Sequence, residues 1–212
     1  MTKKTKEQDV VVQAPNLQTG VFYIRGTSPY VQCAFSKKAR EIMRKQQEAG
    51  STSRKNKAKI AKDFQAAYEQ SMHVSTEGWN GIPAPAFRNA MVSACRLVGF
   101  AMTRAKLCVF IEPDGFDAYD GTPLVRIVKG EPKYAEHAVR IQQTTDLRAR
   151  AMWDPGWEAT VRVRFDADQF TLEDVGNLML RIGMQVGIGE GRPDSRTSCG
   201  MGWGLFELIG KE

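Results

Sequence analysis

The sequence contains few histidines and cysteines, and it has no long apolar run. Two histidines, His73 and His137, and four cysteines occur in the chain, and no two cysteines form a Cys-x-x-Cys pair. Neither histidine lies at metal-ligand spacing from a cysteine, so we expect no metal site and no cofactor. Four scattered cysteines favour a reducing compartment. No apolar run approaches the roughly 18 residues of a membrane-spanning helix, and the polar start MTKKTKEQD has no apolar signal segment behind it. We therefore expect a soluble, cytoplasmic protein without a membrane partner.

The positive charge of the chain is concentrated in one segment. The 212 residues are 42% hydrophobic, which allows a sizeable core, and their formal net charge is +6. Between residues 36 and 62, only Glu41 and Glu48 oppose ten basic residues: Lys37, Lys38, Arg40, Arg44, Lys45, Arg54, Lys55, Lys57, Lys59 and Lys62. A charged helix is usually only a solvated surface. The run as a whole, however, favours binding to nucleic acid, because each neutralised phosphate releases counterions.

The strongest secondary-structure patterns occur in the order strand, helix, strand, strand, helix, strand. They cover residues 21–26, 86–100, 106–112, 159–166, 171–185 and 203–209. This βαββαβ order predicts an α+β, ferredoxin-like or RRM-like fold. Residues 1–18 are expected to be loose, and residues 19–212 to form one domain with insertions at about 30–85 and 113–157. The first insertion has helical patterns at 36–50 and 57–71, a short strand is indicated at 124–128, and residues 129–152 show no clear pattern.

Residues 186–210 are rich in glycine and contain Arg192 and Arg196. A helix precedes these glycines and a strand follows them, and there is no Gly-Lys-Ser/Thr, so a nucleotide-binding loop is excluded. A helix C-cap and a strand entry need only one or two glycines. We therefore favour a loop whose backbone approaches a neighbour closely and whose two arginines meet phosphates, over a purely structural loop.

Three segments resemble the RAMP superfamily of CRISPR-associated proteins. GIGEGRP and GMGWGLFEL (187–193 and 200–208) resemble its C-terminal glycine-rich loop, which joins the last helix to the last strand. GIPAPAFRNAMVSACR (81–96) resembles the run that opens the first helix of the Cas-seven-like backbone subunits and contacts guide RNA. YIRGTSPYVQCAFSKKARE (23–41) resembles the first strand of these subunits and the segment after it. The whole chain also resembles stand-alone phage and prophage proteins.

The resemblance implies a phage-encoded relative of the Cas-seven-like subunits that acts in the host cytoplasm. Such proteins bind single-stranded RNA and assemble head to tail along it, which makes a second copy of the chain and CRISPR-complex subunits the expected protein partners. No match is found for the catalytic aspartate that some subunits carry in a thumb loop, so RNA cleavage is not carried over. The residues expected to bind nucleic acid are Arg25, Lys37, Lys38, Arg40, Arg54, Lys55, Lys57, Trp79, Arg88, Gly189, Gly191, Arg192 and Arg196.

Several of these residues have structural alternatives. Trp79 either stacks on a base or pins the first insertion to the domain, and Arg88 stands where a helix start favours phosphate. Arg25 is expected to share a strand face with Arg162 and Arg164, a face that carries either nucleic acid or solvent.

Three other functions stay open. The first is an endoribonuclease with His73 as general base. The second is a mimic or inhibitor of a CRISPR complex, and the third is a single-stranded DNA-binding or annealing protein.

PDGFDAYDG (113–121) resembles a cation loop in the spacing of its aspartates, but it lacks the downstream glutamate of an EF-hand, so we expect a turn there.

Overall fold

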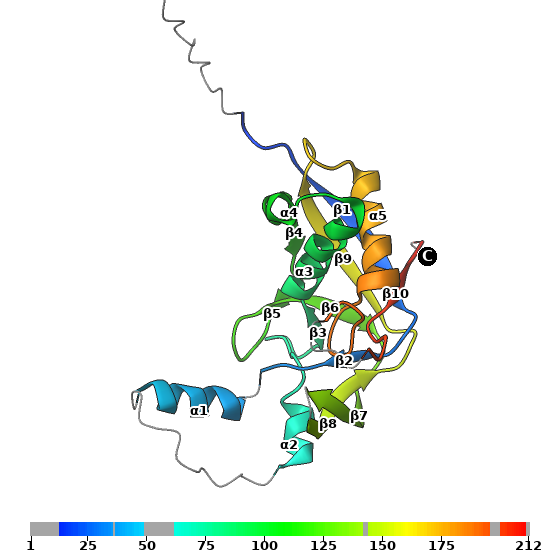
Figure 1. Cartoon of the computed structure of the whole chain (residues 1–212). Coiled ribbons are helices and arrows are strands. Elements are labelled where there is room, and N and C mark those ends of the chain that lie inside the picture. The colour runs from blue at the N-terminus through cyan, green and yellow to red at the C-terminus, as the bar shows by residue number, and fades with distance from the viewer. Residues whose placement is uncertain (1–12, 36, 49–61, 142–143, 196–199, 211–212) are drawn as a thin grey trace, which may run out of the picture.

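The computed structural model describes residues 13–35, 37–48, 62–141, 144–195 and 200–210, with the backbone alone at 37–39, 46, 140–141 and 144. Helices and strands are mixed along these residues (Figure 1), which confirms the mixed α and β class predicted from the sequence. In chain order the elements are β1 (Leu17–Gly26), β2 (Tyr30–Gln32), α1 (Lys37–Glu48), α2 (Phe64–Glu69), β3 (Gly81–Pro83), α3 (Ala84–Ala94), η1 (Cys95–Val98), α4 (Met102–Cys108), β4 (Val109–Glu112), β5 (Gly115–Phe116), β6 (Pro123–Lys129), β7 (Lys133–Ile141), β8 (Thr144–Trp153), β9 (Glu158–Asp166), α5 (Leu172–Arg181), η2 (Ile182–Val186) and β10 (Phe206–Ile209).

The main sheet is antiparallel and is centred on β1 and β9. β1 pairs with β9 along its whole length and with β10 on its other side. The free edge of β9 pairs with two strands in succession, β4 alongside its C-terminal half and β6 alongside its N-terminal end. β3 and β5 extend the sheet beyond β6. The order β10–β1–β9–β4 follows, and the sheet curls where β6, β3 and β5 continue it.

The core lies on the face of this sheet that α3 and α5 cover (Figure 1). On β9, the buried residues Val161, Val163 and Phe165 alternate with Arg162 and Arg164, which lie on the opposite face. This period of two is what a strand with one buried face requires. The helices contribute buried apolar residues at helical spacing, among them Phe87, Met91, Val175 and Met179. Burial of each such side chain stabilises the fold by about 1.5–3 kcal/mol.

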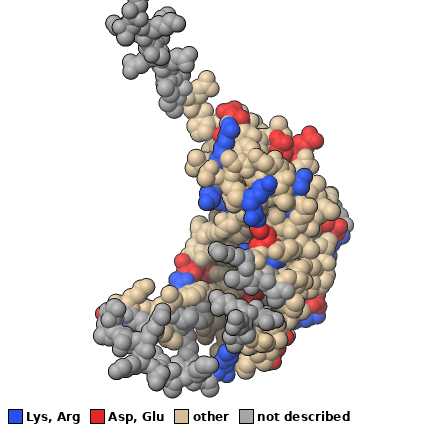
Figure 2. All heavy atoms as spheres, in the orientation of Figure 1, with Lys and Arg blue, Asp and Glu red and all other residues tan. Residues whose placement is uncertain are grey.

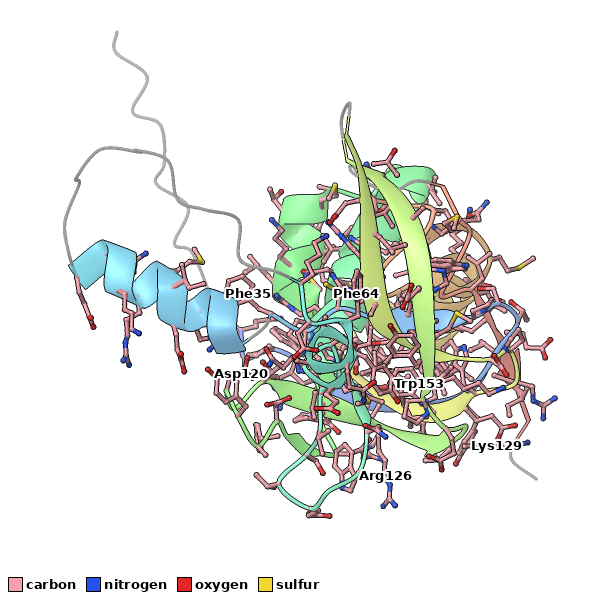
Figure 3. All side chains as sticks on the ribbon, turned by 90° about the horizontal axis from the view of Figure 1, so that it is seen from below. Phe35, Phe64, Asp120, Arg126, Lys129 and Trp153 are labelled. Carbon is pink, nitrogen blue, oxygen red and sulfur yellow. The ribbon has the colours of Figure 1, made fainter. Side chains whose placement is uncertain are left out.

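A second sheet joins the two predicted insertions. β2, from the first insertion, pairs with β8, from the second, so that Tyr30 lies opposite Trp153. β8 forms a long hairpin with β7, and this hairpin accounts for most of residues 129–152. α2, which begins at Phe64, packs against β8, which ends at Trp153 (Figure 3). The hydroxyl of Ser71, just after α2, accepts the N–H of Ala151 at 2.8 Å. The insertions are therefore parts of one structure.

Two strands are shorter than the sequence predicts. The segment 106–112 is a strand only from Val109, because α4 occupies its first half with Ala105 and Cys108 buried three residues apart on one helix face. The last strand begins at Phe206, because Gly204 has a left-handed backbone and packs against the chain at Ile188. The strand predicted at 21–26 extends back to residue 17, and the one at 124–128 is confirmed as β6.

The helix boundaries also differ from the predictions. The helix predicted at 86–100 begins at Ala84, after Pro83, and ends as the 3₁₀ turn η1 before the left-handed Gly99. Of the helix predicted at 57–71, residues 64–69 are helical, and residues 57–61 lie outside the described part. α5 begins at Leu172 with Thr171 as its N-cap, close to the start predicted at 171, and Thr171 forms a capping box with Asp174. Among the described helices, none combines the length and the apolar character needed to cross a bilayer.

α1 projects away from the body of the protein. Its first turn is attached at Arg40, which pairs with Asp120 at 2.8 Å and lies over the rings of Phe35 and Tyr119. Figure 3 shows Phe35 and Asp120 at the base of the helix and the remaining turns pointing outward. Arg40, predicted to bind nucleic acid, therefore also attaches this helix.

Gly183 tests the contact between η2 and the last strand. A Cβ at Gly183 would collide with the backbone oxygen of Phe206 in β10. Because neither backbone can shift freely, Gly183→Ala is expected to lower the free energy of unfolding by about 1–3 kcal/mol, measured by urea denaturation.

The matched control is Gly176→Ala in α5, where the nearest atom to a new Cβ is a Phe22 ring carbon at 3.6 Å. That variant should gain about 0.4–1 kcal/mol. Equal changes in the two variants would contradict the close packing of η2 on β10.

Candidate nucleic-acid interface

A cleft of about 810 Å³ lies between α3, β2 and the segment after η2. We call residues 187–205 the glycine loop, of which residues 196–199 lie outside the described part. One wall of the cleft comes from the segment 81–96, through Pro83, Ala86, Asn89, Ala90, Val92 and Ser93, and another from the glycine loop, through Ile188, Gly189, Glu190, Gly191, Arg192, Asp194 and Ser195. Figure 1 shows the loop, in orange to red, between α3 and β2. The fold thus brings two segments that are far apart in the sequence to one cleft.

The glycines of this loop pack against the protein itself. Gly189 has a φ of +79°, and a Cβ there would lie 2.5 Å from the carbonyl oxygen of Val31 and 2.7 Å from the Tyr30 ring. Gly191, with a φ of +77°, lies against the ring of Trp203. A left-handed backbone without Cβ atoms lets the loop pack directly on β2. The close neighbour expected for Gly189 and Gly191 is therefore internal, and their contact with nucleic acid stays a prediction.

Glu190 attaches the loop to two strands of the second sheet, β2 and β8. Its backbone N–H donates to Val31 of β2 at 2.9 Å. Its carboxylate accepts from Arg148 Nη1 at 2.7 Å and from Arg150 Nε at 2.8 Å, both on β8. Burial raises the pKa of this carboxyl, but the hydrogen bonds and charges of Arg150 and Arg148 outweigh burial and hold the pKa below its usual range.

Asp194 ties the other end of the described loop to α3. Its carboxylate accepts from the Ser93 hydroxyl and from Arg96 Nη2 at 2.6 Å, while its backbone N–H donates to the Val186 carbonyl at 3.0 Å. Burial raises the pKa of Asp194, and the bonds from Ser93 and Arg96 bring it below its usual range. Arg192 donates from Nη1 to the Gly189 carbonyl at 2.9 Å and lines the cleft, as a phosphate-binding residue must.

Lys106 and Arg148 also bring positive charge to the cleft, and neither was among the predicted site residues. Arg148 and Arg150 alternate on β8 with the buried Ala149 and Ala151, so both arginines share one face of the strand. That period of two is visible in the sequence RARA, although the segment was left without a predicted element. Lys106 is on α4, in the segment predicted as a strand.

Arg88 and Trp79 both make contacts within the protein. Arg88 donates from Nε to the Val109 carbonyl at 3.0 Å and from Nη2 to the Lys106 carbonyl, so it fastens α3 to the start of β4. The Trp79 ring packs where a Cβ would stand at Gly81 or Gly115, which supports the pinning alternative. Trp79 is half-buried, and its Nε1–H donates to Glu77 at 3.1 Å.

The open face of the main sheet carries the arginines expected there. Arg25 pairs with Glu158 at 3.0 Å, Arg162 pairs with Asp114, and Arg164 is exposed beside the Phe110 ring. These side chains lie on the opposite face of the sheet from α3 and α5, away from the core. Of the other predicted residues, Arg54, Lys55, Lys57 and Arg196 lie outside the described residues, as do the side chains of Lys37 and Lys38.

Lysines and arginines also gather beside the cleft on the outer surface of α3, η1 and α4, where Figure 2 shows them on the visible face. Exposed members of this group are Arg96, Arg104 and Lys106. Such a group raises the local concentration of an approaching polyanion.

His73 lines the cleft and contacts an aspartate. Its Nδ1 lies 2.8 Å from Oδ2 of the buried Asp117, and its backbone N–H donates to the Gln32 side chain at 2.8 Å. Asp117 also accepts the N–H groups of Tyr119 and Asp120, so the predicted turn in 113–121 is confirmed. One ligand atom each of His73, Asp117 and Asp120 lies within 4.8 Å of the others, and Arg40 pairs with Asp120.

No protein-family model matches the chain, and no curated protein matches it.

Substitution of Gly191 measures how tightly the loop is packed. Gly191→Ala places a methyl group against the Trp203 ring in addition to the strain of a left-handed residue, and we expect a loss of about 2–4 kcal/mol of unfolding free energy. Gly202→Ala is matched in backbone, with a φ of +69° and no atom of the described residues within 4 Å of the new Cβ, so it should lose only about 1–2 kcal/mol. Thermal and urea unfolding, followed by tryptophan fluorescence, compare the two variants. A larger loss at Gly202 would refute this packing.

Proposed function

We propose that the protein binds single-stranded nucleic acid, with RNA as the ligand, in the cleft beside the glycine loop, and that it acts without catalysis. The observation that carries the proposal is the meeting of segments 81–96 and 187–195 in one cleft. The first segment resembles the run that contacts guide RNA in the Cas-seven-like subunits, and the second resembles the C-terminal glycine-rich loop of the RAMP superfamily. The two resemblances lie in separate stretches of sequence, and a shared binding site is the simplest reason for both to face one cleft.

The chemistry of the cleft also supports a single strand. Lys106, Arg148 and Arg192 supply groups for phosphates, and the first turn of α3, at Pro83 and Ala86, opens onto the cleft without a side-chain cap. Exposed N–H groups at a helix start favour anions. The apolar residues Pro83, Ala86 and Met102 line the cleft as well, with part of their surface exposed. Unpaired bases gain from apolar contact with such a surface, whereas the bases of a duplex are not free to make it.

We further propose that the core is ferredoxin-like. The units β1–α3–β4 and β9–α5–β10 interleave in the strand order β10–β1–β9–β4, with both helices on one face. This strand order supports the proposal, because in a split βαβ fold another strand lies between the two strands of each unit.

We also propose that copies of the chain associate head to tail along the bound strand. The projecting α1 region exposes Phe35, Ile42 and Met43, which a neighbouring copy would cover.

Removal of cleft cations should weaken binding. Arg192→Ala and Lys106→Ala are each expected to lower the affinity for a labelled single-stranded RNA of about 16 nucleotides by roughly three- to tenfold, and to reduce the salt slope by about one. Fluorescence anisotropy over a salt series gives both quantities, and the same oligonucleotide as DNA shows which sugar is preferred.

The matched control is Arg181→Ala, which removes the same charge from α5. Arg181 lines a separate groove beside Phe170 and Met184 and hydrogen-bonds to Gln185. Its loss should change the affinity by less than about twofold. A loss as large as that of Arg192→Ala would mean that total charge, and not the cleft, determines binding.

RNA cleavage is the second candidate function, and the contact between His73 and Asp117 favours it. An aspartate that accepts the Nδ1–H of a histidine leaves Nε2 free to act as a base. The histidine also lines the proposed RNA cleft.

Incubation of end-labelled RNA with saturating wild-type protein distinguishes the two functions. We expect the RNA to stay intact while bound. Cleavage products that disappear with His73→Ala and decrease with Asp117→Asn, while the RNA affinity is kept, would establish the second candidate instead.

A further inference from the structure

The glycine loop carries two carboxylates to the cleft, and both already bind arginines. Glu190 bridges Arg148 and Arg150 of β8, and Asp194 binds Arg96 of η1. Glu190 and Asp194 line the same cleft as Arg148 and Arg192. A phosphate that enters the cleft therefore meets Arg148 with its charge partly neutralised by Glu190, and it also meets the negative charge of Asp194.

The backbone holds both carboxylates in place. The N–H of Glu190 donates to Val31 at 2.9 Å and the N–H of Asp194 donates to Val186 at 3.0 Å. Gly189, beside Glu190, has no room for a Cβ against Val31 and Tyr30. Because the loop backbone is packed in this way, the carboxylates cannot move far when an anion approaches, and they compete with its charge.

The apolar part of the cleft is not subject to this competition. Pro83, Ala86 and Met102 keep part of their surface exposed in the cleft, and they offer contact area that depends on the shape and apolar surface of a ligand and not on its charge. Bases of a single strand gain free energy there. A chain of phosphates without bases gains nothing from these residues.

We propose that Glu190 and Asp194 are specificity-determining residues, which make the cleft reject polyanions that lack bases and admit single-stranded nucleic acid. This inference rests on the proposed function, because it names how the same cleft selects its ligand. In this view the carboxylates lower the affinity for every anion, and only a ligand with apolar contacts overcomes the loss. The two residues thus lower the affinity of the cleft for all anions but raise its preference for ligands that carry bases.

The experiment compares the affinities of inorganic polyphosphate and single-stranded RNA for wild-type protein, Glu190→Gln and Asp194→Asn. Each substitution is nearly isosteric and removes one negative charge. Each variant is expected to bind polyphosphate about three- to tenfold more tightly at low salt, with a smaller gain for RNA, so that the preference for RNA falls. Circular dichroism and thermal unfolding check that each variant is folded, and Asp194→Asn tests the inference independently if Glu190→Gln does not fold.

Glu158→Gln is the matched control. Glu158 also bridges two cations, Arg25 and Lys129, but it lies on the open face of the main sheet, away from the cleft. Its substitution removes the same charge and should change the polyphosphate affinity by less than about twofold. An equal gain in this variant would overturn the inference, since net charge alone would then account for the effect.

A purely structural role of the two carboxylates predicts that the variants do not gain affinity for polyphosphate. If Glu190 and Asp194 serve only to orient the arginines, both variants bind polyphosphate and RNA more weakly or unchanged, and the inference is wrong. If wild-type protein fails to bind RNA but the variants gain polyphosphate affinity, the proposed function fails and the exclusion of polyanions stands. The two proposals are therefore tested separately.

Discussion

Glu190 connects three parts of the protein that are far apart in the sequence: the glycine loop, β2 and β8. Its N–H completes the edge of β2 at Val31, and its carboxylate lies between Arg148 and Arg150. Without this residue the loop would have no polar attachment to the second sheet among the bonds described here. The flanking glycines support the same attachment, because Gly189 and Gly191 let the loop backbone come close enough for Glu190 to reach both strands. Glu190 therefore attaches one wall of the cleft to the second sheet, as Asp194 attaches it to α3.

The main sheet determines where the glycine loop begins and ends. α5 packs its apolar face on the sheet, and η2 connects α5 to the loop. After the loop, β10 pairs with the edge of β1. Residues 187–195 of the loop have a defined position against α3 despite their glycines, because Asp194 binds Ser93 and Arg96. The left-handed residues Gly189 and Gly191 are enclosed by Tyr30 and Trp203, so this part of the loop is closely packed.

The sequence was most informative where local pattern and burial agree. β9 was predicted from the alternation around Val161 and Val163, and the start of α5 from Thr171. The short apolar run before Val109 was assigned wrongly, because a few apolar residues fit a helix as well as a strand. Among the predicted site residues, Arg192 lines the cleft in the structure. Arg148 was missed because its role depends on Glu190, which lies some forty residues away in sequence and was not itself singled out. Ion pairs of this kind leave no local signature.

The pairing of β2 with β8 has a consequence for how the chain folds. Tyr30 and Trp153 are separated along the chain by β3 to β7, so closing this pair carries the entropy of a long loop. The main sheet carries the same kind of cost, because β1 pairs with β9 and β10, which lie still further along the chain. The β7–β8 hairpin is the local contact of the second sheet, so we expect it to form early and the pairing of β2, with the cleft beside it, to form late. During synthesis, the cleft can be completed only after the glycine loop has emerged, because this loop follows α3, β2 and β8 in chain order.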